Sequence, residues 1–182
     1  MNRPQLLRFL AIQEGILLLL AFAIANWRHL ALWHGWSLSP RAWGIVALST
    51  LALVVINGLV WVTSEHLRVA ITELFQLVFA SLHLPDLVLV SLLSGISEEI
   101  AFRGVLQPLV GLTVSSFLFA LLHVPSRNLW VYGLWALFAS LYLGNLYVWT
   151  GNLFVPIGVH VLNNLVSLLI WHRSQKGRSP AA

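Results

Sequence analysis

The chain has 182 residues, of which 59% are hydrophobic and only 9% are charged. Soluble domains carry about a quarter of charged residues, so this composition excludes a water-soluble globule, and it equally excludes a disordered chain. The absence of cysteine excludes disulfides, thiolate metal sites and a cysteine nucleophile. A net charge of +4 without a long basic run does not indicate a nucleic-acid partner. We therefore expect a single integral membrane domain over residues 1–182.

Six stretches are predicted to cross the membrane, because a spanning helix needs about 20 mainly apolar residues. They are residues 7–26, 43–63, 86–107, 109–124, 129–149 and 153–171. Proline stands at both ends of the third stretch, as Pro85 and Pro108. The fold class predicted is all-α, a polytopic membrane helical bundle of about six transmembrane helices plus one amphipathic interfacial helix.

The first stretch has a second interpretation. A basic start followed by apolar residues and Ala21-Phe22-Ala23 also fits a secretory signal with its cleavage site. Glu14 interrupts the apolar region, and the stretch is long enough to span, so an uncleaved helix is favoured. Glu14 and Asn57, polar residues of the first two spans, are expected to hydrogen-bond across helices.

Residues 65–83 have a different pattern from the spans. Leu67, Ile71, Leu74 and Val78 recur every three or four residues among charged ones, which predicts a helix with one apolar face. Such a helix either lies along the membrane interface or packs against the bundle, and the sequence leaves both open.

The distribution of basic residues predicts the orientation, because Lys and Arg accumulate in cytoplasmic segments. With the N-terminus inside, the outside collects only Arg28 and Arg41. The inside collects Arg3, Arg8, Arg68, Arg127, Arg173, Lys176 and Arg178. We expect a multi-pass protein of the cell membrane, bacterial cytoplasmic or thylakoid, with both termini in the cytoplasm.

The third span carries three ionisable residues, Glu98, Glu99 and Arg103. Each one at mid-span costs about 2.5–3.5 kcal/mol, so each needs a partner or a function. Glu99 and Arg103 are four residues apart, which favours an ion pair on one helix face. Glu98 lies about 100° further round the helix and remains available as a general base or acid. Alternatively, both glutamates belong to a buried ion network that fixes the helix register.

Two other spans contribute matching polar groups. His123 ends the fourth span, four residues after Phe119, and His160 and Asn164 are four apart in the sixth. Each residue alone is commonly a hydrogen-bonded core residue. Together with Glu98, in apolar surroundings, they predict one shared polar cavity.

Three chemistries fit such a cavity. Glu98 can take a proton from a water that attacks a carbonyl, while a histidine shares that water or protonates the leaving amine, and Asn164 with the other histidine donates to the oxyanion. Alternatively, two histidines and a glutamate can bind zinc, although the H-E-x-x-H pair is absent. The third chemistry is a proton path, because acids and histidines in membrane spans also form proton relays. The first chemistry needs no cofactor, and zinc is the alternative cofactor.

The motifs resemble a known family. Glu98-Glu99 with Arg103-Gly104 is similar to the E-E-x-x-x-R signature of the CPBP intramembrane proteases, which include the Ras-converting CAAX proteases and the bacterial Abi proteins. Phe119 to His123 resembles its F-x-x-x-H motif, and His160 to Asn164 its H-x-x-x-N motif. The motifs occur in the family's order, within a motif-bearing core of residues 86–171.

The resemblance implies a hydrolase, an intramembrane endopeptidase in which Glu98 activates water. It also implies that His123 and His160 position the water or the scissile carbonyl, that Asn164 helps to form the oxyanion site, and that no metal takes part. The supporting residues would be Glu99, Arg103 and Phe119. The expected substrate is a peptide or protein, with a second membrane protein as a possible partner. A non-catalytic immunity or assembly factor that retains the fold is the alternative.

Overall fold

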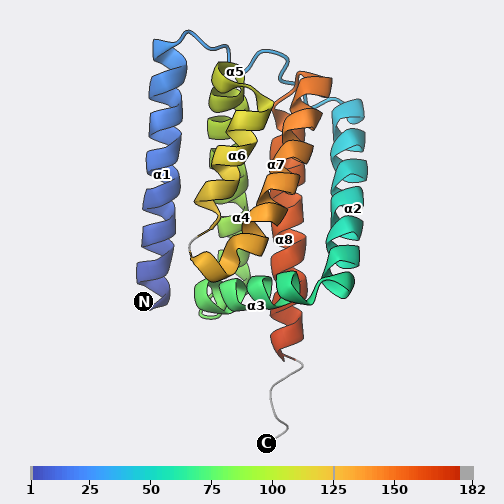
Figure 1. Cartoon of the computed structure of the whole chain (residues 1–182). Helices are drawn as coiled ribbons and strands as arrows, with labels where there is room; N and C mark the ends of the chain where they lie inside the picture. Colours follow the sequence, from blue (N-terminus) through green and yellow to red (C-terminus); the bar gives the residue numbers. More distant parts are fainter. Residues whose placement is uncertain (1, 125, 177–182) are drawn as a thin grey trace, which may run out of the picture.

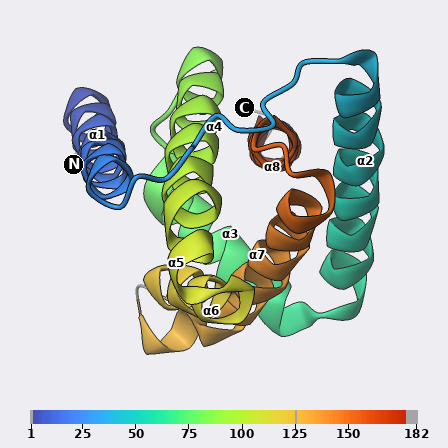
Figure 2. The same cartoon turned by 90° about the horizontal axis from the view of Figure 1, so that it is seen from above.

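The computed structural model describes residues 2–124 and 126–176, which include Lys176 but not Arg178. Within these ranges every regular element is helical: α1 (Arg3–Trp27), α2 (Pro40–Thr63), α3 (Glu65–Phe79), α4 (Leu84–Glu99), η1 (Ile100–Leu106), α5 (Gln107–Val110), α6 (Leu112–Leu122), η2 (Arg127–Leu129), α7 (Trp130–Thr150) and α8 (Phe154–Lys176). The long helices run roughly along one axis (Figure 1). Seen from above, α8 lies between α4 and α2, and it packs against α2, α4 and α7 (Figure 2). The predicted all-α polytopic bundle is confirmed.

Within residues 2–124 and 126–176, fewer helices than the six predicted are long and apolar enough to cross a membrane. Four of the described helices, α1, α2, α7 and α8, each meet this criterion, and a fifth span is counted if α3 and the helix Leu84–Val110 form one broken crossing. The predicted span 109–124 is wrong as a full crossing, because α6 has only 11 residues. At 1.5 Å per residue it covers about 16 Å of a core about 30 Å thick. The start of α1 and the end of α8 lie at the same end of the bundle (Figure 1).

The surface of the bundle is apolar and its interior contains charged groups. Leu19, Leu48 and Val148 are 67–71% exposed, whereas Glu99 and Arg103 are almost completely buried. Soluble proteins rarely expose large contiguous apolar patches. This distribution is typical of helices whose outer faces contact lipid and whose polar groups face one another.

Local sequence signals set the helix ends. The Asn2 side chain accepts from the Gln5 backbone N–H in a capping box, and the Ser39 hydroxyl accepts from the N–H of Ala42 just inside α2. Gly151 ends α7 in the left-handed conformation, with φ of 60°, where a residue without Cβ is favoured.

Helix α3 lies across one end of the bundle (Figure 1), and its axis makes an angle of 109° with that of the helix that follows. Its apolar face buries Leu67 and Ala70, and Phe75 packs against a core cluster that includes Leu87 and Leu168. Of the two alternatives for this amphipathic segment, the structure therefore shows packing on the bundle. Its direction across the bundle axis is also that of a helix lying in the membrane interface.

Candidate active site

The carboxylate of Glu98, near the end of α4, lies between two imidazole rings. Its Oε2 atom is 3.7 Å from Nε2 of His123, at the end of α6, and 4.0 Å from Nε2 of His160 in α8. These distances exceed those of direct hydrogen bonds, about 2.7–3.2 Å, but one water can bridge them. Oε2 is buried and has no partner among the described residues. Oε2 of Glu98 therefore faces both imidazoles without a direct hydrogen bond to either of them.

His123 is oriented by the end of its own helix. Its Nδ1 lies 2.8 Å from the carbonyl oxygen of Phe119, and its ring stacks on the Phe119 ring at 4.2 Å between centroids. The last carbonyls of a helix have no backbone partner within it, and a carbonyl only accepts. Nδ1 therefore carries the hydrogen, and Nε2 faces Glu98. This geometry explains the four-residue spacing of the second motif.

His160 is oriented by Glu99. The Oε1 atom of Glu99 accepts from Nη1 of Arg103 at 2.8 Å and from Nδ1 of His160 at 2.7 Å. Arg103 in turn donates from Nη2 to the backbone and hydroxyl oxygens of Ser140 in α7, at 2.8 and 2.9 Å. The expected Glu99–Arg103 pair is thus present. Because Glu99 also binds Nδ1 of His160, the other ring nitrogen, Nε2, is turned towards Glu98. Helical spacing could not reveal this contact, because His160 is 61 residues away.

Asn164 lies one helical turn from these groups. Its Nδ2 donates to the hydroxyl of Ser94 at 3.2 Å, and Ser94 precedes Glu98 by one turn of α4. Among the described residues no hydrogen bond joins Asn164 to Glu98 or to either histidine. Glu98 therefore lies within 4.0 Å of both predicted histidines, and Asn164 is one helical turn from His160.

The close approach of α4 and α8 depends on Gly95. A Cβ at this position would lie 2.6 Å from Cγ2 of Val161 and 2.9 Å from its backbone nitrogen. Gly95 lies between Ser94 and Glu98 in sequence, and Val161 follows His160. The absence of a side chain at residue 95 therefore permits both inter-helix contacts of the site.

The helix continues beyond Glu99 as a π-helical segment, η1, which helical periodicity did not predict. Such segments are rare and frequently occur at functional sites. Arg103 belongs to it, and Gln107 at its end donates to the carbonyl oxygen of Gly144 at 3.1 Å, one turn along α7 from Ser140. The segment thus connects the Glu98 helix to α7 through two buried side chains.

Two polar residues of the first spans have the cross-helix partners expected for them. Asn57 donates to Oδ1 of Asn163 at 2.7 Å, joining α2 to α8. Glu14 is hydrogen-bonded to the hydroxyl of Ser97, immediately before Glu98. Ser97 and Ser140 were not identified from the sequence, because isolated serines in apolar helices give no distinctive signal.

Zinc was the alternative cofactor expected for Glu98, His123 and His160. Among the residues described, no group of three or more histidines and carboxylates is arranged to hold a metal ion. Glu99 already binds Nδ1 of His160, which leaves Nε2 as the one ring nitrogen of His160 that faces Glu98. No reaction step is assigned to a metal, and zinc dependence stays a prediction to be tested.

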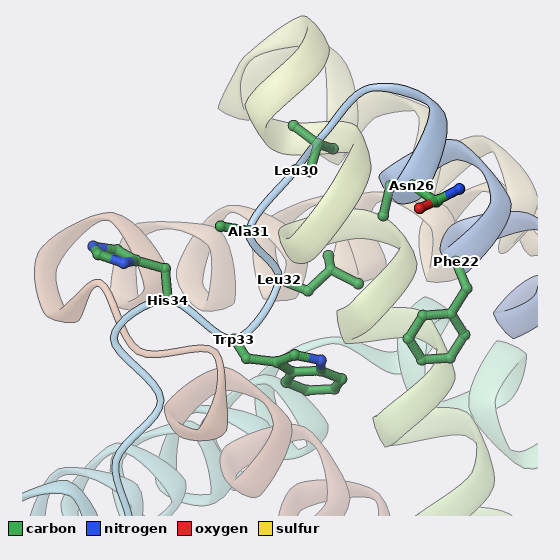
Figure 3. Close-up of a pocket in the computed structure, with 8 residues that line it drawn as sticks. Phe22, Asn26, Leu30, Ala31, Leu32, Trp33 and His34 are labelled. Atoms are coloured by element: carbon green, nitrogen blue, oxygen red, sulfur yellow. The ribbon is translucent and has the colours of Figure 1, made fainter.

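A separate pocket of about 500 Å³ lies at the end of α1 and the segment that follows it (Figure 3). Its lining is mainly apolar and includes Phe22, Leu32 and Trp33. It contains none of the motif residues.

The sequence of this region matches a known family. Residues 80–166, from the end of α3 into α8, match the family described as type II CAAX prenyl endopeptidase Rce1-like. This region is similar to the Rce1-like family. The matched residues contain all three motifs and every residue predicted to be catalytic, which agrees with the resemblance found in the sequence.

A similar protein in Bacillus subtilis (strain 168) is named Uncharacterized protein YpbD. The two are 38% identical over 89 residues, which are 49% of this chain and 47% of that protein. The chain thus matches about half the length of this curated relative. No solved structure matches the chain.

Proposed function

We propose that this protein is an intramembrane endopeptidase of the CAAX-protease type, which hydrolyses peptide bonds with a water molecule activated by Glu98. One observation carries the proposal: Glu98 Oε2 faces Nε2 of both imidazoles within the reach of a single water. The Rce1-like match over residues 80–166 supports the same reaction class.

The hydrogen-bond pattern suggests how the water is held. Nδ1 of His123 donates to a carbonyl oxygen and Nδ1 of His160 to a carboxylate, so each ring in its neutral form presents Nε2 as an acceptor. A water between the three side chains can donate one hydrogen to Glu98 and the other to an imidazole. Its lone pair is then free to attack the carbonyl carbon of a bound substrate.

In the proposed reaction the water oxygen bonds to the carbonyl carbon while Glu98 takes its proton. The carbonyl oxygen becomes an oxyanion, for which we assign the second amide hydrogen of Asn164, the one not donated to Ser94, as a donor. Collapse of this intermediate breaks the C–N bond, and the proton on Glu98 passes to the leaving nitrogen. The products are a carboxylic acid and an amine.

The proposed location of the protein is the cell membrane, with both termini in the cytoplasm. The apolar outer faces favour the cell membrane, and the distribution of basic residues favours cytoplasmic termini. The substrate would be a membrane-associated peptide or protein that reaches the site between helices.

The test is a comparison of membrane proteomes from strains with the wild-type protein and with Glu98→Gln. Substrates should accumulate uncut in the variant, because loss of a general base lowers the rate by about 10²–10⁴-fold. The matched control is Glu73→Gln, at an exposed glutamate of α3, which should cleave normally. If Glu98→Gln restores the function of a deletion strain completely, the protein is a non-catalytic partner instead.

Metal dependence is tested on the purified protein. We expect a chelator to leave the cleavage rate of the accumulated substrate unchanged. Stoichiometric zinc together with loss of activity on chelation would replace the glutamate mechanism with a zinc mechanism.

A further inference from the structure

Glu14 is a buried acid in the middle of α1, outside the residues that match the Rce1-like family. Its side chain is hydrogen-bonded to the hydroxyl of Ser97, the residue before Glu98. Helix α1 packs on α4 and η1, so Glu14 faces the helix that carries the candidate base. Within residues 2–124 and 126–176, none of the ion pairs includes Glu14. A buried acid without a counter-ion needs an explanation.

The single hydroxyl hydrogen of Ser97 determines the form in which Glu14 can be buried beside it. The Ser97 hydroxyl contacts Glu14 and also the carbonyl oxygen of Leu93, at 2.6 Å. It has one hydrogen, and helical serines commonly donate to the carbonyl four residues earlier. If the hydrogen goes to Leu93, Glu14 must supply the hydrogen of the Glu14–Ser97 bond. Both contacts are satisfied only when Glu14 is the neutral acid.

The charged groups near Glu14 also favour its neutral form. The groups that act electrostatically on Glu14 are Glu98, His160 and His123. The other charged groups on α4 and η1 are already paired, Glu99 with Arg103 and Asp86 with Arg3. Two nearby carboxyls in one apolar site do not ionise together readily. A proton kept on Glu14 therefore leaves the negative charge to Glu98.

We propose that Glu14 is a positioning residue of this site, a carboxylic acid that stays neutral, holds α4 through Ser97 and leaves the negative charge to Glu98. This inference rests on the proposed function. It adds a residue from the first helix to a site that is otherwise built from the family-matched region.

The first experiment needs no substrate. Infrared difference spectra of the purified protein at neutral pH compare the wild type with Glu14→Gln. We expect the wild type to show the carbonyl band of a protonated carboxyl group that the variant lacks. A difference band of an ionised carboxylate would overturn the inference.

The second experiment measures cleavage of the peptide that accumulates in the Glu98→Gln strain. Glu14→Ala should lower kcat about tenfold and leave KM nearly unchanged, because one inter-helix hydrogen bond to the site is lost. Glu14→Gln should restore kcat at neutral pH, because its amide also donates. It should also remain active to higher pH than the wild type, because it has no proton to lose. The control is Gly15→Ala, next on α1, where a Cβ meets no atom within 4 Å.

Two results would overturn the inference: wild-type kcat in Glu14→Ala, or a Glu14→Gln pH profile identical to that of the wild type. If Glu14→Ala does not fold, the Glu14→Gln profile and the infrared band decide. Activity in Glu98→Gln would instead refute the proposed function. Inactive Glu98→Gln with unaffected Glu14 variants would refute only this inference.

Discussion

Gly95→Ala is expected to separate the two helices that form the site. The new Cβ would lie 2.9 Å from the backbone nitrogen of Val161, where ordinary contact begins at 3.4 Å. The Val161 side chain, 2.6 Å away, can rotate, but its backbone cannot. The shortfall of about 0.5 Å between 2.9 and 3.4 Å must therefore be met by movement of α4 away from α8.

This movement acts directly on the polar contacts across the two helices. The 4.0 Å separation of Glu98 and His160 and the 2.7 Å hydrogen bond from His160 to Glu99 both cross between α4 and α8. A misplacement of 1 Å can cost about 10²-fold in rate, so 0.5 Å corresponds to about tenfold. Overpacking costs about 1–3 kcal/mol of stability, and the better helix propensity of alanine offsets about 1 kcal/mol. We therefore expect a larger loss of activity than of stability.

The assay combines kcat for the accumulated peptide with thermal unfolding of the purified protein in detergent. Gly58→Ala in α2 is the matched control, because a Cβ there meets no atom within 4 Å. It should retain full activity and be at least as stable as the wild type. Wild-type kcat in Gly95→Ala would refute the argument that close packing of α4 and α8 assembles the site.

Three further substitutions test other contacts. Arg103→Met should destabilise the protein by about 3–5 kcal/mol, because it leaves Glu99 buried without its cation; a melting temperature near that of the wild type would contradict this. Asn57→Ala removes one inter-helix hydrogen bond and should cost about 0.6–1.7 kcal/mol in unfolding experiments, with cleavage unchanged. Phe119→Leu keeps the backbone carbonyl that orients His123 but loses the ring stacking, so kcat should fall about three- to tenfold. For Phe119→Leu, an equal loss of kcat and of protein yield would indicate a folding defect and contradict the role given to ring stacking.

Several features of the protein follow from local sequence alone. Composition indicated membrane helices, because few charges and long apolar stretches are incompatible with folding in water. The Glu99–Arg103 pair followed from their spacing, since residues four apart on a helix are neighbours. The motif order also indicated the family whose model residues 80–166 match.

Other features depended on packing between distant segments. The sequence did not indicate the π-helical turn after Glu99, or which residues of α4 Glu14 and His160 contact. Helical periodicity reports only which residues share a face of one helix. Which face meets which partner is decided when whole helices pack, and here a glycine on α4 brings α8 close enough for the two glutamates and the imidazole of His160 to meet.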